Sequence, residues 1–281
     1  MLAPLHTLAN QCRARHVGLG AFNVIHLENA EAIVAAAEQT GLPVVLQISE
    51  NAVRFHQGNL EPLALATLAI ARDSTARVVV HLDHAKDLGL IRQAIRLGFT
   101  SIMYDGSHLA DDENRATTAK VADWCHDAGI SIEAELGEVG GKDGVHAPGA
   151  RTDPAEAKQF VADTGVDLLA VAVGSSHAMT TRDAALDLDL IRALAREVPV
   201  PLVLHGSSGV SDENMALAIQ AGMTKINVST HLNKVYTHTA RAMLESKPEV
   251  VDTRKWTAPA SQALSDEVAR LLTHYQVGCP V

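Results

Sequence analysis

Histidine residues stand directly after three short apolar runs of this sequence. HLDH at 81–84 ends one run, GSSH at 174–177 follows another, and His205 ends a third. Three imidazoles that converge and leave a fourth position open form the ligand set of a catalytic zinc ion. Any one of these histidines, taken alone, more often makes a local hydrogen bond. Histidines after three separate runs therefore predict a divalent metal that polarises a substrate oxygen.

Asp83 stands beside a candidate ligand in the first of these runs. Neighbouring residues of a regular strand point to opposite faces, so Asp83 and His84 reach one site only if the strand ends there and the chain turns. In that case Asp83 is a candidate acid or base. The alternative is that it caps a helix or belongs to a turn, because Lys86 and Asp87 follow and a helical pattern begins soon after. His81 shares the strand face of Asp83 and is a candidate hydrogen-bond donor behind the site.

Two loops rich in glycine and hydroxyl groups form a second candidate site. The run HGSSG covers residues 205–209, and NVST covers 227–230. Glycine lets the backbone approach a ligand, and consecutive N–H groups with Ser and Thr hydroxyls hold an anion without a positive side chain. Either loop alone is compatible with a plain turn and a helix cap, for which Ser211 and Asp212 have the right form. Together the loops predict a phosphate site.

Eight short apolar or β-branched runs must position these groups, and each has the length of a buried strand. Helical patterns separate the runs, so the alternation predicts an α/β protein with a parallel sheet, and eight units predict a (β/α)8 TIM barrel. An open doubly wound sheet is the rival, but the chain lacks its G-x-G-x-x-G motif. The predicted strands are AFNV (21–24), VVLQIS (44–49), VVVHLD (78–83), SIMYD (101–105), SIEAELG (131–137), LLAVAVG (168–174), LVLHG (202–206) and KINVS (225–229).

The helical patterns complete the predicted barrel. Several begin with Asp, Ser or Glu and end with glycine. We expect residues 1–281 to form a single barrel domain with its chemistry at the carboxyl ends of the strands, where Asp105 ends the fourth run and Glu133 and Glu135 lie in the fifth. The predicted helices cover 27–41, 88–99, 113–129, 153–165, 188–199 and 211–222, and an extra C-terminal helix covers 257–275.

Charge and cysteine content narrow the classes of partner. Of 281 residues, 23 are Lys or Arg and 33 are Asp or Glu, which gives a net charge of −10. This negative charge argues against nucleic acid or an anionic membrane as the partner. Because it also repels an anionic substrate at long range, local hydrogen-bond donors must bind such a substrate. Three cysteines far apart exclude a disulfide framework and fit a reducing cytoplasm. The sequence shows neither a signal peptide nor an apolar run long enough to span a bilayer.

Together these motifs resemble the class-II, metal-dependent fructose-bisphosphate aldolase family, which includes tagatose-bisphosphate aldolases. The similarity runs from residue 21 to about residue 264. The resemblance implies a cytoplasmic enzyme of carbohydrate metabolism and glycolysis, either a homodimer or a homotetramer. It also implies reversible cleavage of a ketose 1,6-bisphosphate into dihydroxyacetone phosphate and an aldehyde. The motifs occur in the family's order and read HLDHA, SIMYDGSH, EAELGEVGG, VAVGSSH, LVLHGSSG and KINVST.

The resemblance also implies residue roles. Asp83 matches the acid or base that acts at the C4 hydroxyl or the aldehyde oxygen, and Asp143 is the nearest match to a mobile-loop carboxylate that moves the second proton. The matching zinc ligands are His84, His177 and His205. Positions that match a second divalent metal or a monovalent cation are Asp105 and Glu135. The matching substrate-binding positions are Asn23, Ser49, Ala178, Gly206, Ser207, Ser208, Asn227, Val228, Ser229 and Thr230.

Two positions depart from the family pattern. Ala178 replaces a glycine whose amide binds phosphate, and alanine keeps the N–H but resists a positive φ. The loop run GGKDG at 140–144 replaces a glutamate-aspartate pair, which leaves Asp143 one methylene shorter than a glutamate.

Three alternatives stay open. In the first alternative, a Schiff-base lysine takes the place of the metal. Lys225 is predicted to begin its strand, which is the end away from the expected site, so Lys86 is the remaining candidate. The chain could also be a class-II aldolase for another sugar- or inositol-derived phosphate. The third alternative is a non-catalytic partner subunit of an aldolase assembly. Such a subunit would be expected to lose metal ligands, whereas this sequence keeps all three histidines.

Overall fold

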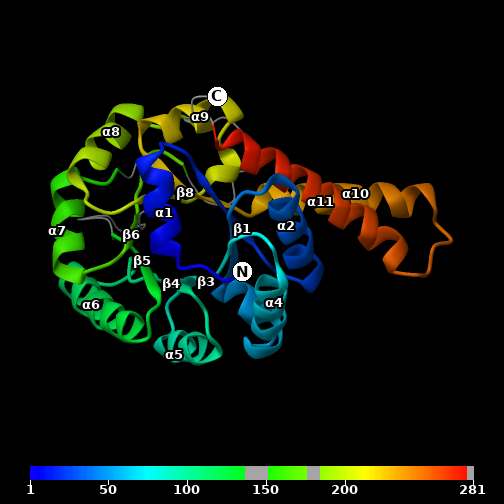
Figure 1. Cartoon of the computed structure of the whole chain (residues 1–281), viewed down its shortest axis with the longest axis horizontal. Coiled ribbons are helices and arrows are strands. Elements are labelled where there is room, and N and C mark those ends of the chain that lie inside the picture. The colour runs from blue at the N-terminus through cyan, green and yellow to red at the C-terminus, as the bar shows by residue number, and fades with distance from the viewer. Residues whose placement is uncertain (137–150, 176–183, 277–281) are drawn as a thin grey trace.

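The computed structural model describes residues 1–136, 151–175 and 184–276. Within them, eight parallel strands pair in chain order, and β8 closes the barrel on β1. Helices surround the strands (Figure 1). The predicted TIM barrel is therefore confirmed. The strands are β1 (Leu19–Asn23), β2 (Val44–Ser49), β3 (Val78–Ala85), β4 (Ser101–Tyr104), β5 (Ser131–Glu135), β6 (Leu168–Ala170), β7 (Leu202–Leu204) and β8 (Met223–Val228).

The helices follow the predicted pattern, and glycine ends several of them. Gly41, Gly98 and Gly165 adopt left-handed φ values just after helices, a conformation that costs glycine little. The predicted helices, including the extra one at the C-terminus, are present, and α1, α3, α4 and α10 add to them. The helices are α1 (Leu5–Ala14), α2 (Leu27–Thr40), α3 (Glu50–Phe55), α4 (Glu61–Asp73), α5 (Leu88–Leu97), α6 (Asp111–Asp127), α7 (Pro154–Thr164), α8 (Leu188–Glu197), α9 (Asp212–Ala221), α10 (Thr230–Ser246) and α11 (Arg254–His274).

Two apolar clusters hold the described residues together. The larger one joins the outward faces of the strands to the surrounding helices. The smaller one fills the barrel interior, where Val45, Val79 and Met103 meet Leu5 and Leu8 of α1. This cluster fills part of the interior with side chains, so the barrel is a packed core and not an open channel. The candidate site residues lie towards the carboxyl ends of the strands.

β6 is shorter than the run LLAVAVG predicts. Val171 still donates its N–H to the Val203 carbonyl of β7 at 3.3 Å. The next residue has a different partner: Thr152 donates its N–H to the carbonyl of Ala172 at 3.0 Å, and the Ala172 N–H donates to the Thr152 hydroxyl at 2.8 Å. Val171 and Val173 remain buried. The apolar character of the run therefore reflects burial beyond the end of the ladder.

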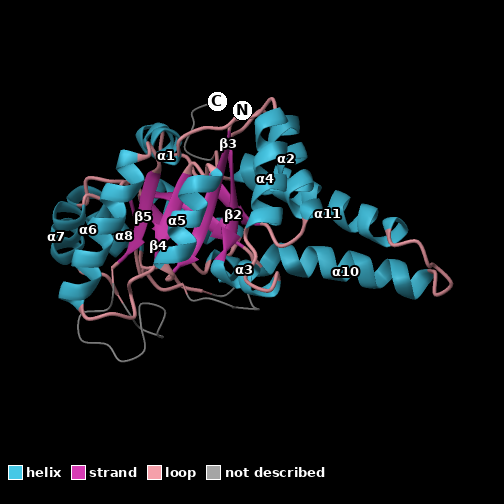
Figure 2. Ribbon diagram, turned by 90° about the horizontal axis from the view of Figure 1, so that it is seen from below, coloured by secondary structure: helices cyan, strands magenta, loops and turns pink. Residues whose placement is uncertain are grey.

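α10 and α11 form a helical hairpin that extends away from the barrel (Figures 1 and 2). α11 packs on α2 as well as on α10. The hairpin exposes Leu244 and Val251, the latter by 90%. Among the described helices, none combines the length and apolar character needed to cross a membrane.

Candidate active site

β3 brings both Asp83 and His84 to the carboxyl end of the barrel. His84 has a φ of 48°, and the pairing of β3 with β4 shifts between Leu82 and Ala85. A left-handed residue breaks the alternation of side chains along a strand, so neighbours can reach one site. The chain thus turns at this point as predicted, although the strand continues to Ala85 instead of ending at Asp83.

The helix that follows is capped by another residue. Asp87 accepts hydrogen bonds from the N–H groups of Gly89 and Leu90 at the start of α5. Asp83 is instead 3% exposed, within the strand. The alternative interpretation of Asp83 as a helix cap is therefore wrong.

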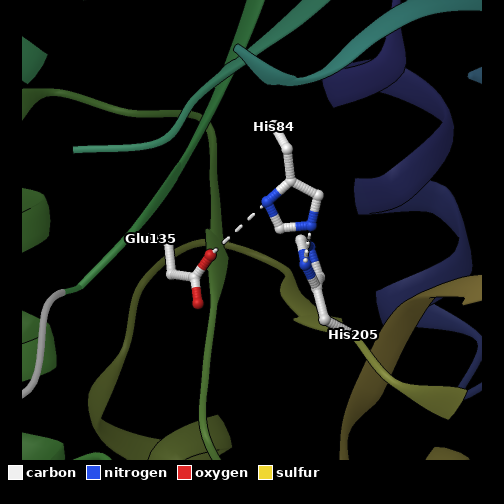
Figure 3. Close-up of side chains that lie close together, drawn as sticks. All are labelled: His84, Glu135 and His205. Atoms are coloured by element: carbon white, nitrogen blue, oxygen red, sulfur yellow. Dashed lines mark hydrogen bonds and ion pairs between the residues drawn. The ribbon is translucent and has the colours of Figure 1, made fainter. Parts of the chain in front are cut away.

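His84, His205 and Glu135 form a cluster at this end of the barrel (Figure 3). Nε2 of His84 lies 2.9 Å from Nδ1 of His205, and the two rings meet edge to face. Oε2 of Glu135 lies 3.9 Å from Nδ1 of His84. One ligand atom from each residue falls within 4.8 Å of the others. Two imidazole nitrogens and a carboxylate oxygen are donors that zinc accepts.

The far nitrogen of each imidazole contacts a carboxylate. Nδ1 of His84 lies 3.3 Å from Asp105, and Nε2 of His205 lies 3.1 Å from Glu133. Since an ionised carboxylate only accepts hydrogen bonds, each ring places its N–H on that far side. When both rings are neutral, the facing nitrogens carry lone pairs 2.9 Å apart, and a metal cation bound there takes the place of the proton that His84 otherwise keeps.

Glu133 belongs to a buried ion pair that the sequence did not assign to the site. Its Oε2 lies 2.9 Å from Nζ of Lys225, and both side chains are fully buried. Lys225 is the third residue of β8, so its predicted place at the start of a strand is wrong. Glu133 and Glu135 share one face of β5 because they are two residues apart, and this spacing could have indicated Glu133.

Lys86, the second candidate for a Schiff base, also contacts a carboxylate. Its Nζ lies 3.7 Å from Oδ2 of Asp105, and the side chain is 45% exposed. A Schiff-base lysine is activated by desolvation in an apolar pocket, whereas the Lys86 side chain is half-exposed beside a carboxylate.

Burial and neighbouring charge shift the pKa values of the site. Burial lowers the pKa of His84, but Asp83 and Asp105 outweigh it and raise the value to about 9. Burial raises the pKa of Asp83, although His84 and Lys225 oppose that change. His81 has a strongly lowered pKa because of burial and Lys225, so it is neutral, and its Nδ1 contacts Ser101 at 2.8 Å. The carboxylates therefore favour a cation near His84.

The loops after β7 and β8 are bound to each other. Gly206 has a φ of 67° and leads into a 3-10 turn, η1 (Ser207–Gly209). The Ser207 hydroxyl donates to the carbonyl of Asn227. The backbone N–H of His231 donates to the Ser208 hydroxyl at 3.2 Å.

These contacts bring η1 to the N-terminus of α10. Ser229 occupies the N-cap position there but makes no side-chain cap. The first N–H groups of a helix lack partners inside it and point outward. The two predicted loops thus meet where backbone donors are available to an anion.

Asn23 and Ser49 lie at neighbouring strand ends. Gln47 donates an amide hydrogen to Oδ1 of Asn23 at 2.8 Å, and Ser49 pairs in register with Asp83. The Ser49 hydroxyl accepts from the Ala52 N–H and caps α3. Asn23 follows Phe22, which pairs with Val228 of the second loop. Three predicted site residues, Asp143, His177 and Ala178, lie outside the described residues.

Comparison with known proteins gives a consistent result. The family model for class-II fructose-bisphosphate aldolase matches residues 3–277. A probable fructose-bisphosphate aldolase from Bacillus subtilis (strain 168) is 37% identical over 270 residues, 95% of each chain. The fructose-bisphosphate aldolase of Staphylococcus aureus (strain Mu50) is 37% identical over 253 residues, 89% of this chain and 88% of the relative. The crystal structure of the YdjI aldolase from Escherichia coli K12 has a TM-score of 0.85 at 30% identity and covers 98% of this chain and 97% of its own.

Proposed function

The chain belongs to the class-II fructose-bisphosphate aldolase family, and from this premise we propose that it uses zinc to cleave a ketose 1,6-bisphosphate of the fructose or tagatose type. The family is metal-dependent and consists of carbon–carbon lyases, so the chain is an aldolase that acts on a phosphorylated sugar. The identity of the metal, the ketose and the residue roles are the parts that we propose.

One observation carries the metal proposal. The facing nitrogens of His84 and His205 are 2.9 Å apart, while the far nitrogen of each ring contacts a carboxylate. This donor set fits Zn²⁺, which accepts imidazole nitrogen and carboxylate oxygen. We propose His177 as the third ligand from its place in the sequence. Asp105 and Glu135 are proposed for a second divalent metal or a monovalent cation, which the position of Glu135 beside His84 supports.

We propose Asp83 as the acid and base at the bond that breaks. A metal ion bound at this site acts as a Lewis acid toward the substrate oxygens. As the C3–C4 bond breaks, Asp83 accepts the proton of the C4 hydroxyl, and in condensation it returns a proton to the aldehyde oxygen. Its Oδ1 is buried and makes no hydrogen bond to the part of the chain that the structure describes. Asp143 is proposed for the second proton transfer, on sequence grounds alone.

We propose that the loops after β7 and β8 bind the phosphate of the dihydroxyacetone-phosphate half. The backbone groups of 206–208 and 227–230 supply donors together with the hydroxyls of Ser208, Ser229 and Thr230, and the N-terminus of α10 adds N–H groups that lack partners inside the helix. With a net charge of −10, the protein needs such local donors for an anionic substrate. Asn23 and Ser49 are proposed as supporting positions, and Ala178 as a further backbone donor.

A panel of ketose phosphates tests the reaction. Cleavage is followed by coupled detection of dihydroxyacetone phosphate, before and after removal of metal by a chelator. We expect cleavage of a fructose or tagatose bisphosphate, loss of activity in the chelator, and recovery with Zn²⁺ or Co²⁺. Preference for another sugar- or inositol-derived phosphate would change the substrate assignment. Full activity of the metal-free protein, or a lysine adduct trapped by borohydride, would exclude the metal proposal.

We propose that the chain assembles as a homodimer or homotetramer in the cytoplasm. The α10–α11 hairpin projects from the barrel and exposes Leu244 and Val251, and we propose it as the surface of contact between chains. Cys12 and Cys125 are free, as expected for a reducing compartment. Light scattering after size-exclusion chromatography tests the assembly, and a monomeric mass at micromolar concentration would contradict it.

A further inference from the structure

α11 lies outside the eight repeating units, yet one of its faces contacts the loops after β7 and β8. Three residues on that face make the contacts: Glu267, Arg270 and His274, spaced three and four residues apart. Residues at this spacing lie above one another on one side of a helix. The helix that extends from the barrel thus also lies behind the proposed phosphate site.

Glu267 holds the start of α10. Its Oε1 lies 2.6 Å from Nε2 of His231, and the two side chains are 16% and 22% exposed. His231 is the second residue of α10, and its backbone N–H donates to the Ser208 hydroxyl. The residue that joins the two loops is therefore fastened to α11 through its side chain.

Arg270 and His274 hold the segment after β7. Nη1 of Arg270 lies 2.8 Å from Oδ2 of Asp212, and the His274 ring donates from Nε2 to the Asp212 carbonyl at 2.8 Å. Asp212 is the first residue of α9 and follows η1 after two intervening residues. Both loops of the proposed phosphate site are thus connected to the same helix.

The two halves of this arrangement share one ion pair. Arg270 donates to both oxygens of Glu267, at 2.8 Å from Nε and 2.7 Å from Nη2. Burial opposes ionisation of Glu267, but Arg270 and His231 overcome it and lower the pKa to about 2. The forked guanidinium fixes the carboxylate in two directions, which restricts its geometry. A continuous path runs from His231 through Glu267 and Arg270 to Asp212.

A small cavity lies beside these contacts. Its volume is about 10 Å³, and Ser207, Ser208 and His231 line it together with Leu271 and Tyr275. A space of that size is the least that admits one water molecule. The polar contacts of Glu267, Arg270 and His274 join the loops to α11 next to this cavity.

We propose that Glu267 and Arg270 are positioning residues for phosphate binding. They hold the loops after β7 and β8 at one separation and orientation, and they act through His231 and Asp212 without touching substrate. A binding site must be held within a fraction of an ångström by the groups behind it. The inference rests on the proposed phosphate site and adds the part of the chain that keeps this site in shape.

Glu267→Gln tests the proposal against a matched control on the same helix, Asp266→Asn. Asp266 is exposed and contacts Gln262 at 2.8 Å. Calorimetry with dihydroxyacetone phosphate, at full metal occupancy, should show about three- to fivefold weaker binding for Glu267→Gln, the size expected for a partly exposed charge network. The control should bind like the parent protein. KM for the ketose phosphate should rise more than kcat falls.

A double-variant cycle provides a second readout. Arg270→Met should weaken phosphate binding by a similar factor, and the double variant with Glu267→Gln should be little worse than either single one, because both act through one path. Arg270→Lys keeps the charge and should recover part of the loss. If Glu267→Gln folds poorly, the two Arg270 variants still test the proposal. Independent, fully additive losses would overturn the proposal.

Comparison with Ser208→Ala separates the possible failures. If Ser208→Ala weakens phosphate binding and Glu267→Gln does not, the positioning role is wrong and the phosphate site stands. If neither variant weakens it, the phosphate site itself is wrong. Equal weakening of unphosphorylated dihydroxyacetone by Glu267→Gln, or an equal effect of Asp266→Asn, would show a general disturbance and also overturn the inference.

Discussion

His84 combines a strained backbone with a demanding chemical position. Its φ of 48° is rare for a residue other than glycine and costs about 1–3 kcal/mol. The surrounding contacts offset this cost, because the ring is held by Asp105 on one side and faces His205 on the other. The strain turns His84 and Asp83 toward the same end of the barrel. The unfavourable backbone conformation of His84 thus positions two functional groups.

Loss of one imidazole should remove the metal and leave the fold. His84→Ala and His205→Ala should each lose about one metal ion per chain, because a catalytic ion depends on every protein ligand. The circular dichroism spectrum should stay that of the parent protein, since the apolar clusters contain neither histidine. Elemental analysis after dialysis measures the metal. Full metal content in both variants would show that the ion binds elsewhere.

Asp83→Asn should affect the reaction and leave the metal in place. Asparagine keeps the shape of the side chain but cannot take the proton of the C4 hydroxyl. General acid–base groups contribute about 10²–10⁴-fold, so kcat should fall within that range. Metal content, measured alongside, should stay at the parent value because Asp83 is not proposed as a ligand. A variant that cleaves at the parent rate would reduce Asp83 to a structural residue.

At the scale of elements, the phosphate site depends on the junction of η1 with α10. The Ser207 hydroxyl binds the Asn227 carbonyl, so it is already engaged. Ser208 accepts a hydrogen bond from His231 and keeps its own hydroxyl hydrogen for another acceptor. Thr230 begins α10, where backbone N–H groups point out of the helix. The Ser208 hydroxyl and the N-terminus of α10 thus meet at one place.

Removal of either hydroxyl should selectively weaken binding of the phosphorylated ligand. A hydrogen bond to a charged group contributes about 1.5–3 kcal/mol, so Ser208→Ala or Thr230→Ala should weaken the binding of dihydroxyacetone phosphate roughly ten- to a hundredfold. Ser208→Ala also removes the link to His231, whereas Thr230→Ala removes no such link. Titration calorimetry with the phosphorylated and unphosphorylated compounds gives the comparison. Equal loss for both compounds would place the phosphate elsewhere.

The sequence predicts the repeating elements well because alternating strand and helix patterns repeat along the chain. The predicted helices omit α10, in which Leu232 and Ala240 are buried, although Leu232, Tyr236 and Ala240 recur at the four-residue spacing of a helix face. The left-handed φ of His84 has no local signal. The pair formed by Glu133 and Lys225 joins strands far apart in sequence, so it depends on barrel register. What the sequence cannot supply is the geometry between distant elements.

At the scale of the whole molecule, burial raises the pKa values of the two described thiols. Cys125 is buried in the larger apolar cluster, and burial raises its pKa to about 12. Cys12 is buried in the interior cluster, and burial raises its pKa to about 11, although Arg15 and Arg77 oppose the change. A cysteine in the unfolded chain has a pKa of about 8.5. The folded chain therefore keeps two protons that the unfolded chain loses as the pH rises above that value.

This difference makes the protein lose stability in alkali. Both folded pKa values are raised, so the stabilisation is complete below about pH 8.5 and declines as the pH rises toward 11–12. Urea unfolding at pH 8 and pH 10 should show a lower unfolding free energy at the higher pH. Cys125→Ala should lose stability at pH 8, because it leaves a cavity, and its loss between the two pH values should be smaller than that of the parent. An equal pH-dependent loss in the variant would show that Cys125 does not contribute.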